Sequence, residues 1–451
     1  MSEPRFSDQW VRSALDLPGN ADVGYDTIRT DTRSLGPGAL FVALVGERFD
    51  AHEFLAAAKA AGAVGAVVRT GTQPVPGLTL YPVTDTLRAL GALAAASRRR
   101  ATGPVIGITG QNGKTSTKEM VAAVLATRWR TYRTRANLNN LVGVPMTILE
   151  APPDAEALVI EAGANLPGEI ARYREIIQPD IALILNAGAG HLEGFGSVEG
   201  VIREKLSLAR DVPLAVVGVE PDSLAPRART LARRVITAGL AGADVVPEGV
   251  SMTPDGRPIV SIDGCRFTLA ARGVHQAGNA MFAWALVREL DLNRAEAAHA
   301  LEEFKVPGGR GELLQHDGIT IVNDGYNANP QSFASAIALA GELRPGRRLV
   351  FVAGTMRELG AHSDSLHREV AARLAALNPD LLVLVGEFVP AFAEYRDGFA
   401  GRLIEAPDAE TVAPLVAEHL LGTELIVLKG SRGVALERIL PAIVARAATP
   451  T

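Results

Sequence analysis

The apolar positions of residues 1–101 form short runs that alternate with helical patterns. Two strand-like runs, Ala39–Val45 and Ala63–Val68, flank the alanine-rich stretch Phe54–Ala61, whose composition favours a helix. Residues 1–101 are therefore predicted to form a small α/β domain with solvated loops. The basic run Ser97–Arg100 ends a further helical pattern. Because cations suit the C-terminal end of a helix, this run indicates a domain edge and not a nucleic-acid surface.

Residues 102–309 alternate strand and helix patterns, which is typical of a mostly parallel sheet. The run Val105–Thr109 leads through a glycine loop into a segment whose apolar residues have helical spacing, namely Met120, Val121, Val124 and Leu125. Two later runs, Leu158–Glu161 and Ile181–Asn186, each end in a polar residue before a glycine-rich turn. The sequence Pro307–Gly311 breaks the pattern, so it is predicted to mark the second domain boundary.

Residues 310–451 alternate in the same way and predict a third domain. Its strand-like runs are Ile319–Val322, Leu349–Val352, Leu381–Val385 and Leu425–Leu428. Asn329 and Pro330 are of the types preferred at the N-cap and at the first position of a helix. No Gly-x-Gly-x-x-Gly follows these strands, so a Rossmann-like domain without a dinucleotide site is expected. A total of three domains agrees with the length of 451 residues, since a domain averages roughly 150 residues.

Composition and charge narrow the class of protein. Apolar residues make up 47% of the chain, enough for sizeable cores, and the net charge of -5 gives no overall basic character that would indicate a nucleic-acid partner. The one cysteine, Cys265, excludes an intramolecular disulfide and a cysteine-rich zinc cluster. Residues 1–15 lack a signal-peptide core, and no uncharged apolar run approaches about 18 residues. We therefore expect a cytoplasmic protein that does not insert into membranes.

The glycine loop after the run Val105–Thr109 is the strongest chemical signal. It reads Gly110, Gln111, Asn112, Gly113, Lys114, Thr115, Ser116. Backbone N–H groups of such a loop and of the following helix bind phosphates, while Lys114 supplies a positive charge and Thr115 an oxygen ligand for Mg²⁺. The usual spelling has glycine where this chain has Ile108, so the match is to the shorter pattern. The alternative to a phosphate-binding loop is an ordinary strand–helix turn without a ligand.

Two polar residues are placed at the same edge of the predicted sheet as the phosphate loop. Glu161 ends one strand-like run, and His191 follows another. Ligands of such sheets collect at the carboxyl ends of the strands, so both residues are expected to converge on the nucleotide. Taken singly, each is also compatible with a solvated loop residue.

Lys205 lies on the apolar stripe of a predicted helix. Ser197 can cap this helix, whose stripe consists of Val198, Val201, Ile202, Leu208 and Ala209. A lysine on such a stripe either extends to solvent from the helix edge or is held in a partly dry site. In a dry site, desolvation leaves some neutral amine, which can react with CO₂ to give a carbamate, an anionic oxygen ligand for Mg²⁺.

Short strings in all three predicted domains share their spelling with one protein family. They are Asp31-Thr-Arg33, Leu40–Leu44, Phe49–His52, Thr109–Lys114, Asn137–Asn140, Gly143-Val-Pro145, Gly190–Ser197, Asn323–Pro330, Glu358-Leu-Gly360 and Lys429–Arg432. With them the chain resembles the Mur ligases, which are ATP-dependent amide ligases of bacterial cell-wall precursor synthesis. The strings around His191, Tyr326 and Lys429 single out the dipeptide-adding member. Gly325 and Gln276 depart from that member, which usually has serine and asparagine there.

The resemblance implies a reaction and its cofactors. ATP would phosphorylate the terminal carboxylate of UDP-MurNAc-tripeptide, and the amine of D-Ala-D-Ala would attack the acyl phosphate to give UDP-MurNAc-pentapeptide, ADP and phosphate. Lys114, His191 and Lys205 are the implied catalytic residues. Thr115 and Glu161 would ligate one Mg²⁺, and His191 with Lys205, carbamylated by CO₂, would hold a second. A monomer is expected, and the third peptide residue of the substrate stays open between meso-diaminopimelate and lysine.

The resemblance also implies the binding residues. Besides residues 110–116 of the phosphate loop, the nucleotide would be bound by Asn279 at the adenine, Asp324 at the ribose, Arg310 from the domain hinge, and Asn137 and Asn140 nearby. Substrate would be bound by Thr32, Arg33, Asp50, His52, Asn139, Tyr326, Asn327, Lys429, Ser431 and Arg432. Domain 1–101 would bind the UDP moiety, domain 102–309 ATP, and domain 310–451 the dipeptide and the ATP ribose. The alternatives are an amide ligase that adds a single amino acid or glutamate, and a nucleotide-binding module without ligase chemistry.

Overall fold

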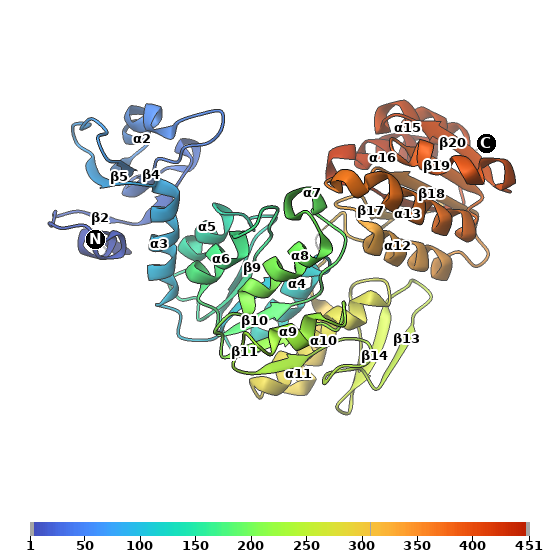
Figure 1. Cartoon of the computed structure of the whole chain (residues 1–451), viewed down its shortest axis with the longest axis horizontal. Helices are drawn as coiled ribbons and strands as arrows, with labels where there is room; N and C mark the ends of the chain where they lie inside the picture. Colours follow the sequence, from blue (N-terminus) through green and yellow to red (C-terminus); the bar gives the residue numbers. More distant parts are fainter. Residues whose placement is uncertain (1–3, 307, 448–451) are drawn as a thin grey trace. The chain divides into compact units, whose positions relative to one another are not determined.

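The computed structural model describes residues 4–306 and 308–447, which form two compact units (Figure 1). The first unit comprises the described residues up to Thr109 together with Arg128–Ala164 and Gly168–Ala182. The second comprises Gly110–Thr127, Asn165–Pro167 and the described residues from Leu183 onward. Pro307, which we assigned to the second domain boundary, lies outside the described residues. Each sheet below lies at the centre of an α/β arrangement, as predicted, apart from two small antiparallel sheets.

A parallel four-stranded sheet begins the first unit. Its strands, in order, are β3 (Thr27–Arg29), β4 (Ala39–Val42), β5 (Ala63–Arg69) and β6 (Thr79–Val83). The predicted helix is present as α2 (Leu55–Ala60), and its buried Leu55 and Ala58 pack with Phe41 and Ala66 of the sheet. The first predicted strand is shorter than expected and ends at Val42.

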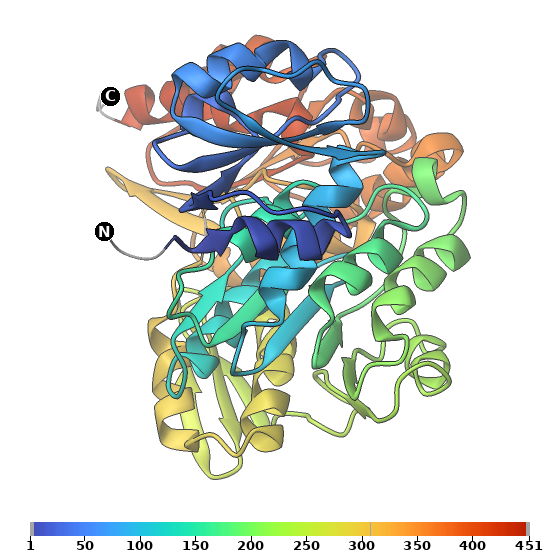
Figure 2. The ribbon, with the colours of Figure 1, turned by 90° about the vertical axis from the view of Figure 1, so that its left-hand side faces the viewer.

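Two helices of the first unit pack against each other beside a two-stranded antiparallel pair. They are α1 (Asp8–Leu15) and α3 (Thr86–Arg98), and the pair is β1 (Phe6–Ser7) with β2 (Gly24–Tyr25) (Figure 2). A buried polar network fixes α1: Tyr81 Oη donates to Asp8 Oδ1 at 2.6 Å, and Tyr25 Oη lies 2.7 Å from Tyr81 Oη. Because buried polar groups need partners, this network specifies where α1 packs.

The phosphate loop lies on a six-stranded sheet. Its strand order is β12 (Val235–Thr237), β11 (Leu214–Val217), β10 (Ile181–Ile184), β7 (Val105–Thr109), β9 (Ala157–Glu161) and β8 (Thr131–Arg133). The pairs β7–β9, β8–β9 and β11–β12 are parallel, and every residue of β7 is buried, as expected for a strand covered on both faces. The helix after the loop is α4 (Lys114–Leu125), which packs against α10 (His275–Glu289) and α11 (Arg294–Glu303).

The small antiparallel sheet within residues 249–268 was not predicted from the sequence. It consists of β13 (Gly249–Met252), β14 (Pro258–Ile262) and β15 (Cys265–Thr268). Its Phe267 ring stacks on Trp284 of α10 at a centroid distance of 5.4 Å. Trp284 Nε1 and the guanidinium of Arg288 donate to Asp263 in the turn between β14 and β15. This pairing ties the hairpin to the helix that carries Asn279.

A second six-stranded sheet forms the last part of the chain. Its order is β16 (Glu312–His316), β17 (Ile319–Asp324), β21 (Leu425–Lys429), β18 (Leu349–Gly354), β19 (Leu381–Val385) and β20 (Arg402–Ala406). All neighbouring strands are parallel except β16–β17. The four predicted strands are confirmed, whereas both edge strands, β16 and β20, were missed. Short edge strands with mixed exposure carry a weak hydrophobic pattern.

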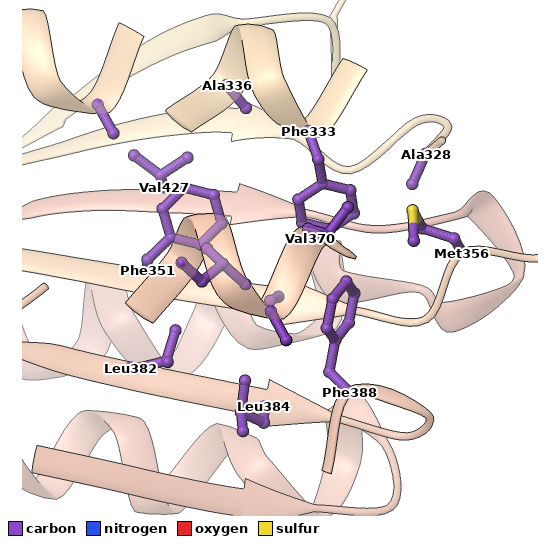
Figure 3. Packing of buried hydrophobic residues seen from close by; sticks show 14 of the residues in the cluster. Ala328, Phe333, Ala336, Phe351, Met356, Val370, Leu382, Leu384, Phe388 and Val427 are labelled. Carbon is purple, nitrogen blue, oxygen red and sulfur yellow. The ribbon is translucent and has the colours of Figure 1, made fainter. Parts of the chain in front are cut away.

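Helices cover both faces of this last sheet. On one face, Phe333 of α12 (Pro330–Leu343) and Val370 of α13 (Ser363–Leu377) pack with Phe351 and Phe388 (Figure 3). On the other face, α15 (Ala409–Glu418) and α16 (Leu440–Ala447) pack against Val350, Val383 and Ile426 among others. The predicted start of α12 is confirmed: Asn329 is the N-cap in a capping box with Ser332, and Pro330 is the first helical residue.

Candidate active site

The phosphate loop has the geometry that its sequence predicts. Gly113 is the N-cap of α4 and has a φ of +81°, a conformation that favours glycine. A Cβ at this position would lie 2.5 Å from Oδ1 of Asn279, so the amide of α10 packs directly on the loop. Asn279 is also held by its neighbour, because its Nδ2 donates to Gln276 Oε1 at 3.0 Å. The structure therefore brings Asn279 to the glycine loop.

Lys114 and the first turn of α4 complete the loop. Lys114 Nζ donates to the carbonyl oxygens of Gly110 and Gln111 at 2.8 and 3.1 Å, so its ammonium lies over the loop. Thr115 and Ser116 are buried in the same turn. Backbone N–H groups at the start of a helix attract anions, and this 12-residue helix provides them beside a lysine.

Asn186 is a site residue that our sequence analysis missed. It follows β10, and its Oδ1 accepts hydrogen bonds from the backbone N–H groups of Gln111 (3.1 Å) and Asn112 (2.9 Å). Its Nδ2 donates back to the Asn112 carbonyl at 3.3 Å. Asn186 therefore braces the loop from the neighbouring strand. The signal in the sequence was the polar residue that ends the apolar run Ile181–Asn186.

Lys205 is buried, with only 1% of its surface exposed. It lies near the end of α8 (Val198–Leu206), which the predicted N-cap Ser197 begins by accepting a hydrogen bond from Gly200 N. The burial excludes the interpretation in which the ammonium extends to solvent. The predicted stripe needs two corrections. Val198 is 39% exposed, because it occupies the first helical position and not the packed face. Leu208 and Ala209 are buried but lie beyond the end of α8, in the short 3₁₀ helix Ser207–Ala209.

His191 contacts the carboxylate of Glu358, which lies between β18 and α13. Its Nδ1 lies 2.5 Å from Oε2 of Glu358. Contact with His191 holds the pKa of Glu358 below its usual value. The backbone reinforces the approach, since Glu193 N donates to the Glu358 carbonyl at 3.3 Å. The string Glu358-Leu-Gly360 had no role assigned from sequence, and the structure shows that its Glu358 contacts His191.

Glu161 is buried at the end of β9 in the first unit. The register of β7 and β9 places it opposite Ile108, one residue before β7 ends. Its carboxylate accepts a hydrogen bond from Asn139 Nδ2 at 2.9 Å. Asn140 Oδ1 instead accepts from the N–H groups of Val142 and Gly143 at the start of α5 (Gly143–Glu150). Within this unit, Asn139 is the asparagine that meets Glu161.

Asp324 and Lys429 form a close pair at the carboxyl ends of β17 and β21. The parallel register places them side by side, and Lys429 Nζ lies 2.7 Å from Asp324 Oδ2. The buried ammonium also donates to the carbonyl of Asn327 at 2.7 Å. His275, the first residue of α10, is affected by both charges. Burial lowers its pKa, and Asp324 opposes that shift while Lys429 adds to it.

Two guanidinium groups lie on the ring of Tyr326. The distance from the ring centroid is 4.0 Å to Arg310 and 5.1 Å to Arg432. Such cation–π contacts orient the guanidinium groups beside the pair formed by Asp324 and Lys429. The Oγ of Ser431 accepts a hydrogen bond from Arg357 N at 2.9 Å, so this hydroxyl supports the neighbouring loop. The structure thus brings Asp324, Asn327 and Lys429 together, and it places Arg310 and Arg432 on the ring of Tyr326.

The candidate UDP residues form two small clusters in the first unit. Arg33 is exposed, and its guanidinium donates hydrogen bonds to both carboxylate oxygens of Asp31 at the turn that begins at Thr32. These bonds lower the pKa of Asp31 to about 2. In the second cluster, Asp50 contacts the backbone N–H and the Nδ1 of His52. His52 Nε2 accepts from Arg69 N at 2.8 Å, so Nδ1 carries the proton of the neutral ring.

Two negative findings apply to residues 4–306 and 308–447. These residues contain no cluster of three or more histidine, cysteine, aspartate or glutamate side chains that could hold a metal ion. No helix in this part of the chain combines the length and the apolar character that crossing a bilayer requires.

The fold and the loop define the class of protein. A glycine-lysine-threonine loop that joins a strand of a mostly parallel sheet to a helix is typical of a nucleotide-binding enzyme of the P-loop type. Two family models match the chain: the Mur ligase middle domain over residues 108–287, and the Mur ligase, glutamate ligase domain over residues 309–432.

Individual proteins agree with the family models. The UDP-N-acetylmuramoyl-tripeptide–D-alanyl-D-alanine ligase of Bacillus subtilis is 34% identical over 442 residues, which are 96% of each chain. A crystal structure of MurF from Acinetobacter baumannii is 30% identical with a TM-score of 0.88 and covers 98% of this chain and 99% of its own. A MurF ligase structure from Thermotoga maritima in complex with ADP is 27% identical with a TM-score of 0.81, covering 94% and 98%. The chain belongs to the Mur ligase family.

Proposed function

We propose that this protein joins D-alanyl-D-alanine to UDP-MurNAc-tripeptide at the expense of ATP. The observation that carries the proposal is the phosphate loop, with Lys114 over it and Asn279 packed on it. The similarity over 96% of this chain to the UDP-N-acetylmuramoyl-tripeptide–D-alanyl-D-alanine ligase of Bacillus subtilis supports it. The product is UDP-MurNAc-pentapeptide, with ADP and phosphate. The alternatives are a Mur-type or folylpolyglutamate-type ligase with another acceptor, and a non-catalytic nucleotide-binding module.

The nucleotide binds at the phosphate loop. The similarity to a MurF ligase solved with ADP supports this assignment. Lys114 and the N–H groups at the start of α4 hold the β- and γ-phosphates, because phosphoryl transfer depends on positioning and charge neutralisation. Asn279 contacts the adenine, Asp324 the ribose, and Arg310 the nucleotide from the domain hinge. Asn137 and Asn140 are further nucleotide-binding residues of this proposal.

The donor set suits magnesium. The hydroxyl of Thr115 and the carboxylate of Glu161 are the oxygen ligands that Mg²⁺ prefers, and both side chains are buried. His191 and Lys205 would hold a second ion, for which the buried amine of Lys205 would combine with CO₂ to give a carbamate and a proton. When bound, Mg²⁺ supplies positive charge against the γ-phosphate and the substrate carboxylate.

The remaining charged groups hold the two substrates. The basic residues around Tyr326, namely Arg310, Arg432 and Lys429, face the acyl phosphate and the carboxylate of the dipeptide, with Asn327 and Ser431 beside them. Asn139 supports Glu161. Thr32, Arg33, Asp50 and His52 bind the UDP moiety. Water must be kept from the acyl phosphate, and we expect the domain 310–451 to close on the nucleotide for that purpose.

The organisation follows from this assignment. Residues 1–101 form the UDP-substrate domain, residues 102–309 the ATP domain, and residues 310–451 the domain for dipeptide and ribose. We expect the protein to act as a monomer in the cytoplasm, where ATP is available. The third peptide residue of the substrate, meso-diaminopimelate or lysine, is to be decided by assay.

An acceptor panel tests the proposal. Phosphate release is measured with ATP and UDP-MurNAc-tripeptide, together with D-Ala-D-Ala, D-Glu or a diamino acid, and the products are weighed by mass spectrometry. The proposal expects turnover and the pentapeptide mass with D-Ala-D-Ala alone. Turnover with a single amino acid only, or rapid ATP hydrolysis that no acceptor stimulates, would contradict it.

Two lysine variants test the catalytic assignments. Lys114→Ala and Lys205→Ala are expected to abolish ligation, whereas Lys305→Ala, at an exposed lysine, should retain it. If Lys205 acts as its carbamate, added bicarbonate should raise the rate of the CO₂-depleted wild-type enzyme. A fully active Lys205→Ala variant would remove the carbamate from the account.

A further inference from the structure

The side chain of Asn112, in the middle of the phosphate loop, is bound by the start of α12. Its Nδ2 donates to Asn329 Oδ1 at 3.2 Å and to Gln331 Oε1 at 2.8 Å. Its Oδ1 accepts from Asn329 Nδ2 at 2.7 Å. The carboxamides of Asn112 and Asn329 therefore form a reciprocal pair. All three residues belong to the second compact unit.

The two partners on α12 are fixed independently of Asn112. Asn329 is the N-cap, and its Oδ1 also accepts from Ser332 N at 2.9 Å while Ser332 Oγ accepts from Asn329 N at 3.0 Å. Gln331 Nε2 donates to Glu220 Oε2 at 2.8 Å. Because these bonds set their positions, α12 is the rigid side of the contact and the glycine loop is the side that it orders.

The loop is also held from the strand beside it, by Asn186, and from α10, whose Asn279 packs on Gly113. Asn186 bonds to the backbone groups of Gln111 and Asn112, whereas the side chain of Asn112 bonds to α12. Gly113, the next residue, adopts its positive φ and begins the helix that faces the phosphates. A loop fixed on both sides has fewer conformations to lose when it binds a ligand.

We propose that Asn329 and Gln331 are positioning residues for nucleotide binding, which act through Asn112 and hold the phosphate loop in its binding conformation. The inference rests on the proposed function in one respect, namely that the loop binds the phosphates of an adenine nucleotide. Neither Asn329 nor Gln331 touches the nucleotide in this scheme. The two side chains make the affinity for ATP and ADP depend on the third domain, through a contact distinct from the ribose and dipeptide residues.

The test is a double-mutant cycle on ADP affinity, measured by titration calorimetry. Gln331→Ala and Asn329→Ser each remove bonds to Asn112, while serine retains an N-cap for α12. Each single change should weaken ADP binding by roughly threefold to tenfold, the range for loss of a hydrogen bond. In an Asn112→Ala background, the same changes should alter the dissociation constant less than about twofold, because the bonds are already absent.

A matched control and a second measurement separate positioning from loss of folding. Glu342→Ala, at the far end of α12, should leave ADP binding unchanged in both backgrounds. Backbone hydrogen exchange over residues 110–114 should be faster in Gln331→Ala than in the control, with the melting temperature preserved. Equal effects of Gln331→Ala with and without Asn112 would overturn the inference. A wild-type chain that binds no ADP would refute the proposed function itself.

Discussion

Gly113 offers a sharp test of the phosphate loop, because both its conformation and its surroundings exclude a side chain. Gly113→Ala would hold alanine at a φ of +81°, which costs about 1–2 kcal/mol. The new Cβ would lie 2.5 Å from Asn279 Oδ1, so Asn279 has to turn and lose its bond to Gln276, at about 1 kcal/mol. Together these two costs of keeping the loop in its present conformation are about 2–3 kcal/mol, and the loop can avoid them by moving away from that conformation.

We therefore expect the strain to appear in nucleotide binding. A cost of about 2–3 kcal/mol corresponds to an ADP dissociation constant raised roughly 30-fold to 150-fold, measured by titration calorimetry. Gly346→Ala is the matched control, since Gly346 has a φ of +74° with nothing near its Cβ position. The control should lower the melting temperature slightly and leave ADP binding unchanged. If Gly113→Ala bound ADP within threefold of the wild type, the reasoning about the loop would be refuted.

Two further predictions concern stability. Tyr81→Phe removes the hydroxyl that donates to Asp8, and should lower the free energy of unfolding by about 1–3 kcal/mol in urea denaturation; an unchanged midpoint would contradict the role of this network. Arg288 holds the pKa of Asp263 at about 2, so this carboxylate stabilises the fold above its unfolded pKa of about 4, and the contribution is lost as the pH falls through 2. Asp263→Asn should therefore cost up to about 2 kcal/mol at pH 7 and much less near pH 2, and an equal cost at both pH values would exclude the ion pair as its cause.

Local signals in the sequence predicted local structure well. The apolar run Val105–Thr109 and the helical spacing after it became β7 and α4, because both patterns are read from neighbouring residues. The same holds for Asn329 and Pro330, whose preferences at a helix start do not depend on distant contacts.

Contacts between segments that are far apart in the sequence could not be predicted from the sequence alone. Asn186 braces the phosphate loop only because β10 lies beside β7 in the sheet, and the order of strands is not written in any one run of residues. The contact of Glu358 with His191 and that of Asn112 with α12 also join segments that are far apart in the sequence. The resemblance to a family pointed to the strings that contain Asn112, His191 and Glu358, but it did not point to Asn186 and did not say which side chains meet.

Lys205 shows where a pattern left two interpretations and burial decided between them. A lysine on an apolar stripe fits both an extended side chain and a dry site, and the exposed Val198 shows that the stripe was drawn too widely. The exposure of 1% places Lys205 inside the packed face. The role as a carbamate remains a prediction that the bicarbonate experiment tests.

The central claim is that this protein activates a carboxylate by phosphorylating it. The most direct measurement uses UDP-MurNAc-tripeptide labelled with ¹⁸O in its terminal carboxylate, incubated with ATP and D-Ala-D-Ala, and follows the label by mass spectrometry. Transfer of one ¹⁸O atom to each phosphate released is the predicted result, because the acyl phosphate keeps a carboxylate oxygen when the amine displaces it. Phosphate that carries no label, with oxygen from water instead, would contradict the account.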